Sequence, residues 1–458
     1  MNTTKFDAII IGFGKGGKTL AADLAGRGWS VAILERSDKM YGGTCINIGC
    51  IPTKTLVHDA KQAFRLTQAS FEERNDFYVK AIERKKSVVE ALRKKNYNLL
   101  FDKPNVTVFN GEGSFLSNDT VQVKRDDKTE FLTAPHIFID TGATSVIPPI
   151  EGAAGNPFVY TSTSLMETEV LPKRLVIVGG GYIGLEFASM YASFGSKVTV
   201  LEYGSSLIAR EDRDIAEAVR KALEHKGVEF RLGVAVNSIL NDGSKAVVHY
   251  SDAATGMESH DIDAEAVLLS TGRKAETASL NLDAAGVKTD ARGNIIVDEH
   301  LLTSNPSVYA LGDVKGGLQF TYISLDDYRI VRDHLFSEKG RSTWDRTPVV
   351  YSMFIDPPMS RIGMSEDDAK SAGLDYSVRT LPVTSIPRAK TLGESEGLLK
   401  AIVEKKTGKI LGCTLFCPES SEIINIVSLA MKAGLPAESL HNFIFTHPSM
   451  SEALNDLF

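Results

Sequence analysis

The chain has 458 residues, more than one hydrophobic core usually supports, so we expect several domains. It carries 51 basic and 58 acidic residues, and this balance gives no indication of a nucleic-acid partner. Its longest apolar runs are far shorter than the roughly 20 residues of a membrane-spanning helix, and no signal-peptide cleavage pattern follows the first run. We therefore expect a cytoplasmic protein with no membrane partner.

The first 35 residues predict a strand, a glycine-rich turn, a helix and a second strand. The apolar run AIII is typical of a strand that is buried on both faces of a sheet. The run is followed by glycines with the spacing of a dinucleotide-binding turn, Gly12, Gly14 and Gly17. Gly12 allows the tight turn, Gly14 allows the backbone to approach a pyrophosphate, and Gly17 allows the helix to pack closely on the strand. Glu35 ends the second strand, where a carboxylate accepts hydrogen bonds from ribose hydroxyls.

The same pattern recurs later in the chain. Gly179, Gly181 and Gly184 lie in RLVIVGGGYIG, and Glu202 ends the strand after the next helix. The offset from the first glycine to the glutamate is identical in the two units, so coincidence is a poor explanation. The repeat predicts two dinucleotide sites in one chain.

Three further segments have recognisable patterns. Residues 70–100 are rich in Lys, Arg and Glu and predict a long helix with a solvated face. Alternating residues over 105–125 predict a small antiparallel sheet. From about residue 346 onward, strand patterns precede helices without any nucleotide motif, which indicates a catalytic or association domain.

Two more strands end in polar residues. HIFIDTGA ends with Thr141, Gly142 and Ala143, and AVLLSTGRKA repeats that Thr-Gly ending. A third strand pattern, VYALGDV, leads to Gly312 and Asp313. The repeated ending again fits a duplicated architecture.

Four cysteines in a chain of this length are no disulfide framework. Cys45 and Cys50 are close together in GGTCINIGC, and such a pair in a reducing compartment indicates a catalytic or metal-binding site. A structural disulfide or two buried thiols are the alternatives. A position near a helix N-terminus also lowers the pKa of a thiol. For Cys413 and Cys417 we expect a structural role, since buried cysteine is common in strands.

The motifs GFGKGG, GGTCINIGCIPTK, DTGA, GGGYIGLE, STGRKA, ALGDV and THPSMSE occur in that order. Together they resemble the flavoprotein disulfide reductases, the family of glutathione reductase, lipoamide dehydrogenase and mercuric reductase, over essentially the whole chain. MYGGTCINIGCIPTKTLVHDA and GGLQFTYISLDDYRIVRD resemble the mercuric-reductase-like branch, and within it the cupric reductases of reactive-chlorine resistance. The second stretch lacks the His and Glu-Gly that are usual in the family, which argues against a glutathione or lipoamide substrate.

The resemblance implies an α/β fold with two Rossmann-like domains, for FAD and NAD(P)H, and a C-terminal α+β dimerisation domain. The implied segments are 1–148 and 272–345 for the FAD-binding and central parts, 149–271 for NAD(P)H, and 346–458 for the interface. It also implies a homodimer with an active site shared between subunits.

The resemblance assigns roles to individual residues. Cys50 lies against the flavin as the charge-transfer thiolate, and Cys45 is the outer thiol that meets the substrate. Lys54 lies near flavin N5 and pairs with Glu186. A cation there stabilises the reduced flavin electrostatically.

The motif HPSMSE supplies His447 and Glu452. An imidazole is the natural general acid–base at neutral pH, and a carboxylate holds its ring and tautomer. In the family this pair reaches the outer thiol of the other subunit. The remaining cofactor contacts implied are Gly12, Gly14, Gly17, Glu35, Gly43, Thr44, Lys54, Gly113, Thr141, Gly142, Gly179, Gly181, Tyr182, Ile183, Gly184, Glu202, Gly272, Arg273, Gly312 and Asp313.

Glu202 predicts NADH as the nicotinamide cofactor, because a carboxylate repels a 2′-phosphate and binds a free ribose hydroxyl. Arg210 lies close enough in sequence to bind a phosphate instead, which keeps NADPH as the alternative.

Three functional hypotheses follow. In the first, electrons pass from NADH through FAD and the Cys45–Cys50 pair to a metal ion, Cu(II) or Hg(II), in defence against oxidative, reactive-chlorine or metal stress. The thiolates then act as transient soft ligands of the substrate metal. In the second, the acceptor is a small disulfide. In the third, the protein senses redox state or binds metal without turnover.

Overall fold

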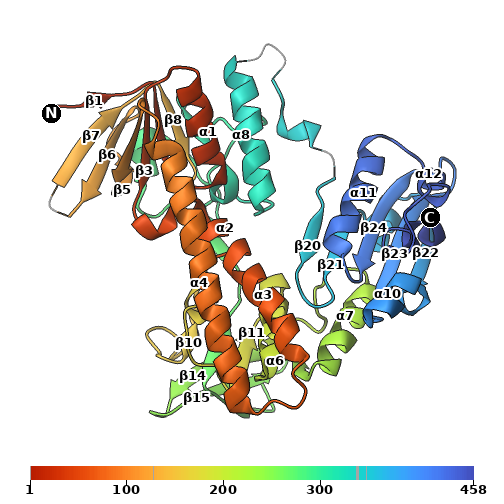
Figure 1. Ribbon diagram of the computed structural model, residues 1–458. Helices are drawn as coiled ribbons and strands as arrows, with labels where there is room; N and C mark the ends of the chain where they lie inside the picture. Colours follow the sequence, from red (N-terminus) through yellow and green to blue (C-terminus); the bar gives the residue numbers. More distant parts are fainter. Residues whose placement is uncertain (1, 127, 337–339, 347) are drawn as a thin grey trace. The chain divides into compact units, whose positions relative to one another are not determined.

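The computed structural model describes residues 2–126, 128–336, 340–346 and 348–458 (Figure 1). They fall into two compact units, each assembled from segments that are separate in the sequence. The first unit comprises Met1–Thr55, Ile82–Val146 and Gly272–Arg346, and the second comprises Leu56–Ala81, Ile147–Thr271 and Thr347–Phe458. The four-segment domain division made from the sequence stays a prediction.

A parallel sheet with the strand order β19-β8-β2-β3-β4 forms the centre of the first unit. Its strands are β2 (Ala8–Ile11), β3 (Val31–Glu35), β4 (Val106–Asn110), β8 (His136–Ile139) and β19 (Val308–Ala310). Every residue of β2 and β3 is buried, as expected of strands covered on both faces. Helices α1 (Lys15–Gly26) and α8 (Thr321–Phe336) pack against each other in this unit (Figure 1).

The predicted antiparallel sheet is correct only in part. β5 (Glu112–Phe115), β6 (Thr120–Arg125) and β7 (Lys128–Thr133) pair antiparallel, and β1 (Thr4–Lys5) runs parallel to β7 at the edge. The segment before them forms β4 and joins the parallel sheet beside β3. The chain changes sheets at Gly111, where a Cβ would lie 2.7 Å from the carbonyl oxygen of Lys124. β9 (Ala143–Ser145) and β18 (Arg273–Ala275) form a further antiparallel ladder.

The second unit contains the repeated strand–glycine–helix pattern. Its parallel sheet has the order β10-β17-β11-β12-β13, with β10 (Val159–Tyr160), β11 (Arg174–Val178), β12 (Lys197–Glu202), β13 (Val228–Leu232) and β17 (Ala266–Leu269). The helices here are α5 (Ser162–Leu165), α6 (Tyr182–Phe194) and α7 (Arg213–His225). An antiparallel ladder follows, of β14 (Val234–Asn241), β15 (Ala246–Asp252) and β16 (His260–Ala264).

The C-terminal part of the second unit is an antiparallel sheet with helices, in the order β20-β21-β24-β23-β22. Its strands are β20 (Tyr351–Met353), β21 (Met359–Gly363), β22 (Tyr376–Pro382), β23 (Leu398–Glu404) and β24 (Ile410–Phe416). Its helices are α9 (Glu366–Ser371), α10 (Pro387–Leu392), α11 (Ser420–Lys432), α12 (Ala437–His441) and α13 (Ala453–Leu457). Cys413 and Cys417 are buried in its apolar core, in agreement with the structural role expected of them.

The other helices are α2 (Gly43–Asn47), α3 (Cys50–Phe64), α4 (Phe71–Phe101) and the short 3-10 helices η1 (Asp38–Met40), η2 (Leu282–Ala285), η3 (Gly312–Lys315), η4 (Thr343–Asp345) and η5 (Val383–Ser385). The predicted long polar helix is confirmed as α4. Two parallel α/β sheets and a C-terminal α+β part confirm the predicted fold class. No helix among the residues described above is both long and apolar enough to cross a bilayer.

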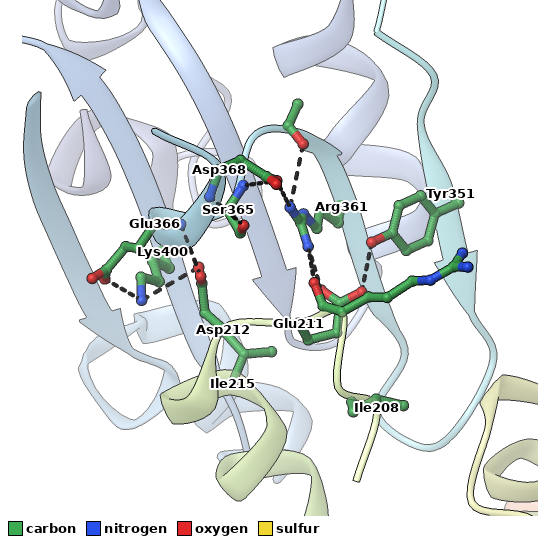
Figure 2. Close-up of polar contacts among 12 residues, drawn as sticks. Ile208, Glu211, Asp212, Ile215, Tyr351, Arg361, Ser365, Glu366, Asp368 and Lys400 are labelled. Atoms are coloured by element: carbon green, nitrogen blue, oxygen red, sulfur yellow. Dashed lines mark hydrogen bonds and ion pairs between the residues drawn. The ribbon is translucent and has the colours of Figure 1, made fainter. Parts of the chain in front are cut away.

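A buried charge network ties the segment before α7 to the C-terminal sheet (Figure 2). The carboxylate of Glu211 is fully buried and accepts hydrogen bonds from the hydroxyls of Tyr182 (2.6 Å) and Tyr351 (2.5 Å). Its other oxygen lies 3.2 Å from Nη1 of Arg361 on β21. Each oxygen of this buried charge therefore has a partner, as burial of a charge requires.

A second cation, Lys400 on β23, completes the network (Figure 2). Its ammonium lies 2.9 Å from both oxygens of Asp214 and 3.4 Å from Asp212, and it also pairs with Glu366. Because only 4% of the Lys400 side chain is exposed, these carboxylates replace the water that the ammonium loses.

We expect Glu211→Gln to destabilise the second unit by about 3 kcal/mol or more, because it removes the buried carboxylate that faces the guanidinium of Arg361 and leaves only the mostly exposed Asp368 as its charge partner. Glu217→Gln on α7 is the matched control. It also removes one carboxylate, but Glu217 pairs with Arg220 in a part-exposed position, so the loss is below about 1 kcal/mol. Thermal denaturation of both variants checks this, and equal losses would contradict it.

Candidate functional site

The structure brings the two predicted redox cysteines together. Cys45 lies within the short helix α2, and Cys50 is the first residue of α3. Both carry free thiols, and the side chains of Cys45 and Cys50 are hydrogen-bonded to each other. Cys50 is exposed and Cys45 is half-buried.

The cysteine loop is packed against the first glycine turn. A Cβ on Gly43 would lie 2.7 Å from the Cα of Gly14, closer than any side chain tolerates. Gly42 and Gly43 both have positive φ values, +100° and +74°, which L residues with side chains rarely adopt. The amide of Asn47 donates to the carbonyl oxygens of Tyr41 and Gly43 and closes the loop. The loop therefore has one position relative to α1.

The first glycine turn has the shape predicted for it. Gly12 has φ +105°, and a Cβ there would lie 2.3 Å from the carbonyl oxygen of Asp140. At Gly17 a Cβ would lie 2.9 Å from the Ile10 side chain, which is the close helix packing expected of this position. Gly14 caps α1 with extended backbone and no side-chain hydrogen bond of its own. In the first turn of α1, the backbone N–H groups of Gly16 and Gly17 donate to Ser324 at 2.9 Å and to Asp140 at 2.6 Å.

Carboxylates surround this turn. Glu35 accepts from the backbone N–H of Phe13 at 3.2 Å, and burial raises its pKa. Asp313 lies in η3, and burial likewise raises its pKa. Gly312, next to it, donates its backbone N–H to Asp327 at 2.7 Å. A glycine turn at a helix N-terminus and carboxylates for hydroxyl groups fit the pyrophosphate, ribose and ribityl parts of FAD.

The second glycine motif repeats this geometry. Gly179 has φ +104°, and a Cβ on Gly184 would lie 2.1 Å from the carbonyl oxygen of Gly179. Gly181 caps α6 without a side-chain hydrogen bond, and a Cβ there would have nothing within 4 Å. Glu202 accepts from the backbone N–H of Gly180 at 2.5 Å. The open space before α6 fits the pyrophosphate of a second dinucleotide.

The predicted site residues after the second glycine motif differ in their partners and in their exposure. Tyr182 donates its hydroxyl to Glu211, as described above, and Ile183 has an exposed fraction of 37%. Glu186 accepts from the backbone N–H of Phe354 at 2.7 Å. Lys54 lies on α3 in the first unit, and its pairing with Glu186 stays a prediction.

The other predicted cofactor contacts occupy the ends of strands. Thr141 donates its hydroxyl to the carbonyl oxygen of Glu276 at 2.8 Å. Gly142 has φ +75°, and a Cβ on it would lie 3.8 Å from the hydroxyl oxygen of Thr44. The structure therefore brings Thr44 next to the first Thr-Gly ending, on the side of the cysteine loop.

Gly113 and Gly272 differ in their surroundings. A Cβ on Gly113 would lie 2.6 Å from the Leu34 side chain, so strand packing by itself requires glycine there. Gly272 has φ +110° and open space where a Cβ would be. The guanidinium of Arg273 donates to the carbonyl oxygen of Ala143 and interacts electrostatically with Cys50.

Two residues beside the cysteines had no assigned role in the sequence. The hydroxyl oxygen of Thr321 lies 3.7 Å from Sγ of Cys50, and Tyr322 interacts electrostatically with the same thiol. Both begin α8, in the stretch QFTY that departs from the usual family pattern. The departure of this stretch from the usual family pattern is the feature of the sequence that could have pointed to these two residues. The sequence does not show which of them reaches the sulfur of Cys50.

The pKa expected for the thiols from their helical position is wrong for Cys45. Its hydrogen bond with Cys50 raises the pKa of the Cys45 thiol, and burial raises it further. A hydrogen bond with Thr321 and the charge of Lys18 act in the opposite direction but are smaller. The neighbouring thiol and burial therefore set the direction of the Cys45 pKa, because a hydrogen bond to the neutral thiol and the loss of water both disfavour the thiolate.

His447 and Glu452 form the pair predicted from their motif. Nδ1 of His447 lies 2.7 Å from one oxygen of Glu452, which holds the ring in place. The His447 side chain is 72% exposed, so its other ring nitrogen is accessible. The second oxygen of Glu452 is buried and has no hydrogen-bond partner among the residues that the structure describes.

Comparison with known proteins identifies the family. The model of the pyridine nucleotide-disulphide oxidoreductases matches residues 6–327, and the model of their dimerisation domain matches residues 349–458. The chain belongs to the pyridine nucleotide-disulphide oxidoreductases. The resemblance seen in the sequence motifs is thereby confirmed.

Comparison with individual relatives shows which members of the family the chain resembles. The chain is 51% identical over 454 residues to the probable pyridine nucleotide-disulfide oxidoreductase RclA of Escherichia coli, with 99% of each chain covered. The solved Cu(II) complex of HOCl-induced flavoprotein disulfide reductase RclA from Escherichia coli matches with a TM-score of 0.93 and 50% identity, covering 100% of this chain and 99% of that chain. Mercuric reductase of Bacillus cereus is 32% identical over 98% of this chain and 70% of its own length.

Membership in the family makes the chain an FAD-dependent oxidoreductase that uses NADH or NADPH. The predicted class of enzyme is confirmed, and so is a C-terminal dimerisation domain. The roles assigned to individual site residues stay predictions.

We expect Gly43→Ala to lower both FAD content and thermal stability. The variant combines the cost of positive φ, about 1–2 kcal/mol, with a clash against Gly14 of about 1–3 kcal/mol. Gly28→Ala is the matched control, since Gly28 has φ +90° but nothing within 4 Å of its Cβ position. FAD absorbance per chain and melting temperature measure both effects, and identical behaviour of the two variants would refute the packing argument.

Proposed function

We propose that this enzyme passes electrons from NADH through FAD and the Cys45–Cys50 pair to a metal ion, with Cu(II) as the acceptor. The observation that carries the proposal is the pair of neighbouring, mutually hydrogen-bonded free thiols. Two adjacent sulfurs are suitable soft ligands for the Cu(I) product. The solved Cu(II) complex of a relative with 50% identity supports copper as the metal. The biological setting is defence against reactive chlorine or metal stress in the cytoplasm.

The chemistry balances without a further reactant. FAD, when bound, accepts hydride from the nicotinamide and delivers the electron pair to the cysteines. Reduction of the disulfide by that pair and one proton gives one thiolate and one thiol. These sulfurs then return two electrons to two Cu(II) ions, which yields two Cu(I), the disulfide and one proton. The protein's part is to hold the two sulfurs next to each other, in hydrogen-bond contact.

A small disulfide is the second candidate acceptor, and the His447–Glu452 pair favours it. A disulfide leaves as a thiolate that needs a proton, and an imidazole fixed by a carboxylate supplies one. We propose that His447 reaches the cysteine pair of the other subunit in a homodimer. The matched dimerisation domain and the exposure of His447 support this arrangement.

Purified enzyme with NADH should show Cu(II)-dependent NADH oxidation well above its rate with glutathione disulfide or lipoamide. Cys45→Ala should reduce the Cu(II)-dependent rate by about 100-fold or more, because one sulfur can neither bind the metal as a pair nor form the disulfide. Cys413→Ala, which changes a buried cysteine outside the site, is the matched control. Anaerobic Cu(I) detection with bathocuproine measures the product directly.

Faster turnover of a disulfide without metal would replace the first candidate by the second. A cysteine-independent rate with every acceptor would instead indicate a sensor or binding protein.

We also propose NADH as the preferred cofactor. Both oxygens of Glu202 accept backbone hydrogen bonds, from Gly180 at 2.5 Å and Gly204 at 2.7 Å, so the carboxylate is held at the end of β12. A fixed negative charge in this position repels the 2′-phosphate of NADPH.

The value of kcat/KM should be at least about tenfold higher for NADH than for NADPH. Repulsion between two adjacent like charges costs more than roughly 1.4 kcal/mol of binding free energy, which corresponds to a factor of ten. Glu202→Gln should narrow this ratio by removing the charge while retaining the side-chain volume. Steady-state kinetics with both cofactors test this, and a preference of the wild type for NADPH would overturn it.

A further inference from the structure

Lys18 is a buried cation that no motif explained. It lies in the first turns of α1, directly after the glycine turn, and is only 5% exposed. Lysine is almost never buried unless a carboxylate neutralises it. Across the ranges that the structure describes, Lys18 forms no ion pair with a carboxylate within 4 Å. A buried ammonium of this kind lowers stability unless something else offsets its charge.

The position of Lys18 is fixed by Asn96 on α4. The ammonium donates to the amide oxygen of Asn96, whose amide nitrogen donates to the carbonyl oxygen of Leu92 at 2.7 Å. Asn96 also lies close to the cysteine loop, since a Cβ on Gly42 would lie 3.3 Å from its Cγ. A neutral amide therefore holds the lysine beneath the loop without cancelling its charge.

The charged and titratable groups that Lys18 faces are Lys15, Cys45 and Asp140. Asp140 accepts from the backbone N–H of Gly17 at 2.6 Å, and burial raises its pKa well above the usual range. Burial, followed by the charge of Lys15, lowers the pKa of Lys18 to about 8, so the ammonium is still protonated at pH 7. Cys45 is then the group that gains most from this charge when it becomes negative.

We propose that Lys18 is a positioning residue for electron transfer, whose buried ammonium stabilises the negative charge of the reduced Cys45–Cys50 pair and so raises its reduction potential. The proposal rests on the redox role proposed for the pair. Reduction of the disulfide takes two electrons and one proton and leaves one thiolate. A charge is created only in the reduced state, so a nearby cation stabilises that state selectively. Arg273 faces Cys50 in a comparable way, so each sulfur has a cation near it.

The test is the thiol–disulfide equilibrium of the holoenzyme in buffers of reduced and oxidised dithiothreitol at pH 7. After an acid quench, a maleimide reagent of high mass counts the free thiols by gel shift. For Lys18→Met, we expect the equilibrium constant for reduction to fall about tenfold, which corresponds to about 30 mV for two electrons. Lys39→Met is the matched control, because it removes one lysine from the exposed surface of the same unit and should leave the potential unchanged.

Asn96→Asp provides a second, independent variant. The new carboxylate neutralises Lys18 in place, so it should lower the potential in the same direction even if Lys18→Met loses FAD or stability. An unchanged equilibrium in a folded Lys18→Met, or in Asn96→Asp, overturns the role of Lys18. A wild type whose cysteines form no disulfide in any of these buffers overturns the proposed function itself, and this outcome is distinguishable from the first.

Discussion

The close approach of the backbone at Gly43 and Gly14 is the contact on which the candidate site depends. It places the cysteine loop against the N-terminus of α1, beside the first dinucleotide turn. A methyl group at Gly43 would overlap the turn, so the loop and the turn can meet only as bare backbone. A cysteine pair beside the first dinucleotide turn thus requires two glycines that belong to different sequence motifs.

The duplicated dinucleotide units share a further interaction besides their glycines. Glu35 and Glu202 each accept from the backbone N–H of a turn residue 22 positions earlier, Phe13 and Gly180. The carboxylate that is expected to bind a ribose therefore also ties the end of the second strand to the glycine turn. This explains in physical terms why the same spacing occurs twice in one chain.

Buried charge serves different purposes in the two units. In the second unit, Glu211, Arg361 and Lys400 have opposite charges within reach, and their network holds the segment before α7 on the C-terminal sheet (Figure 2). In the first unit, Lys18 has an amide partner in place of a carboxylate. A buried charge with a counter-ion holds packed segments together. A buried charge without a counter-ion stabilises a negative group that forms nearby.

The sequence by itself determined the features that depend on short spacings. The two glycine turns, the Cys45–Cys50 pair and the His447–Glu452 pair each lie within a few residues or one strand–helix–strand unit, so local geometry brings their members together. Tertiary structure alone decided that β4 leaves the antiparallel sheet, because strand partners are set by the path of the chain at Gly111. It also decided that Thr321 contacts Cys50 and that Asn96 holds Lys18, whose charge acts on Cys45. These residues come from helices far apart in the sequence, and no periodic pattern in the sequence predicts which of their side chains meet.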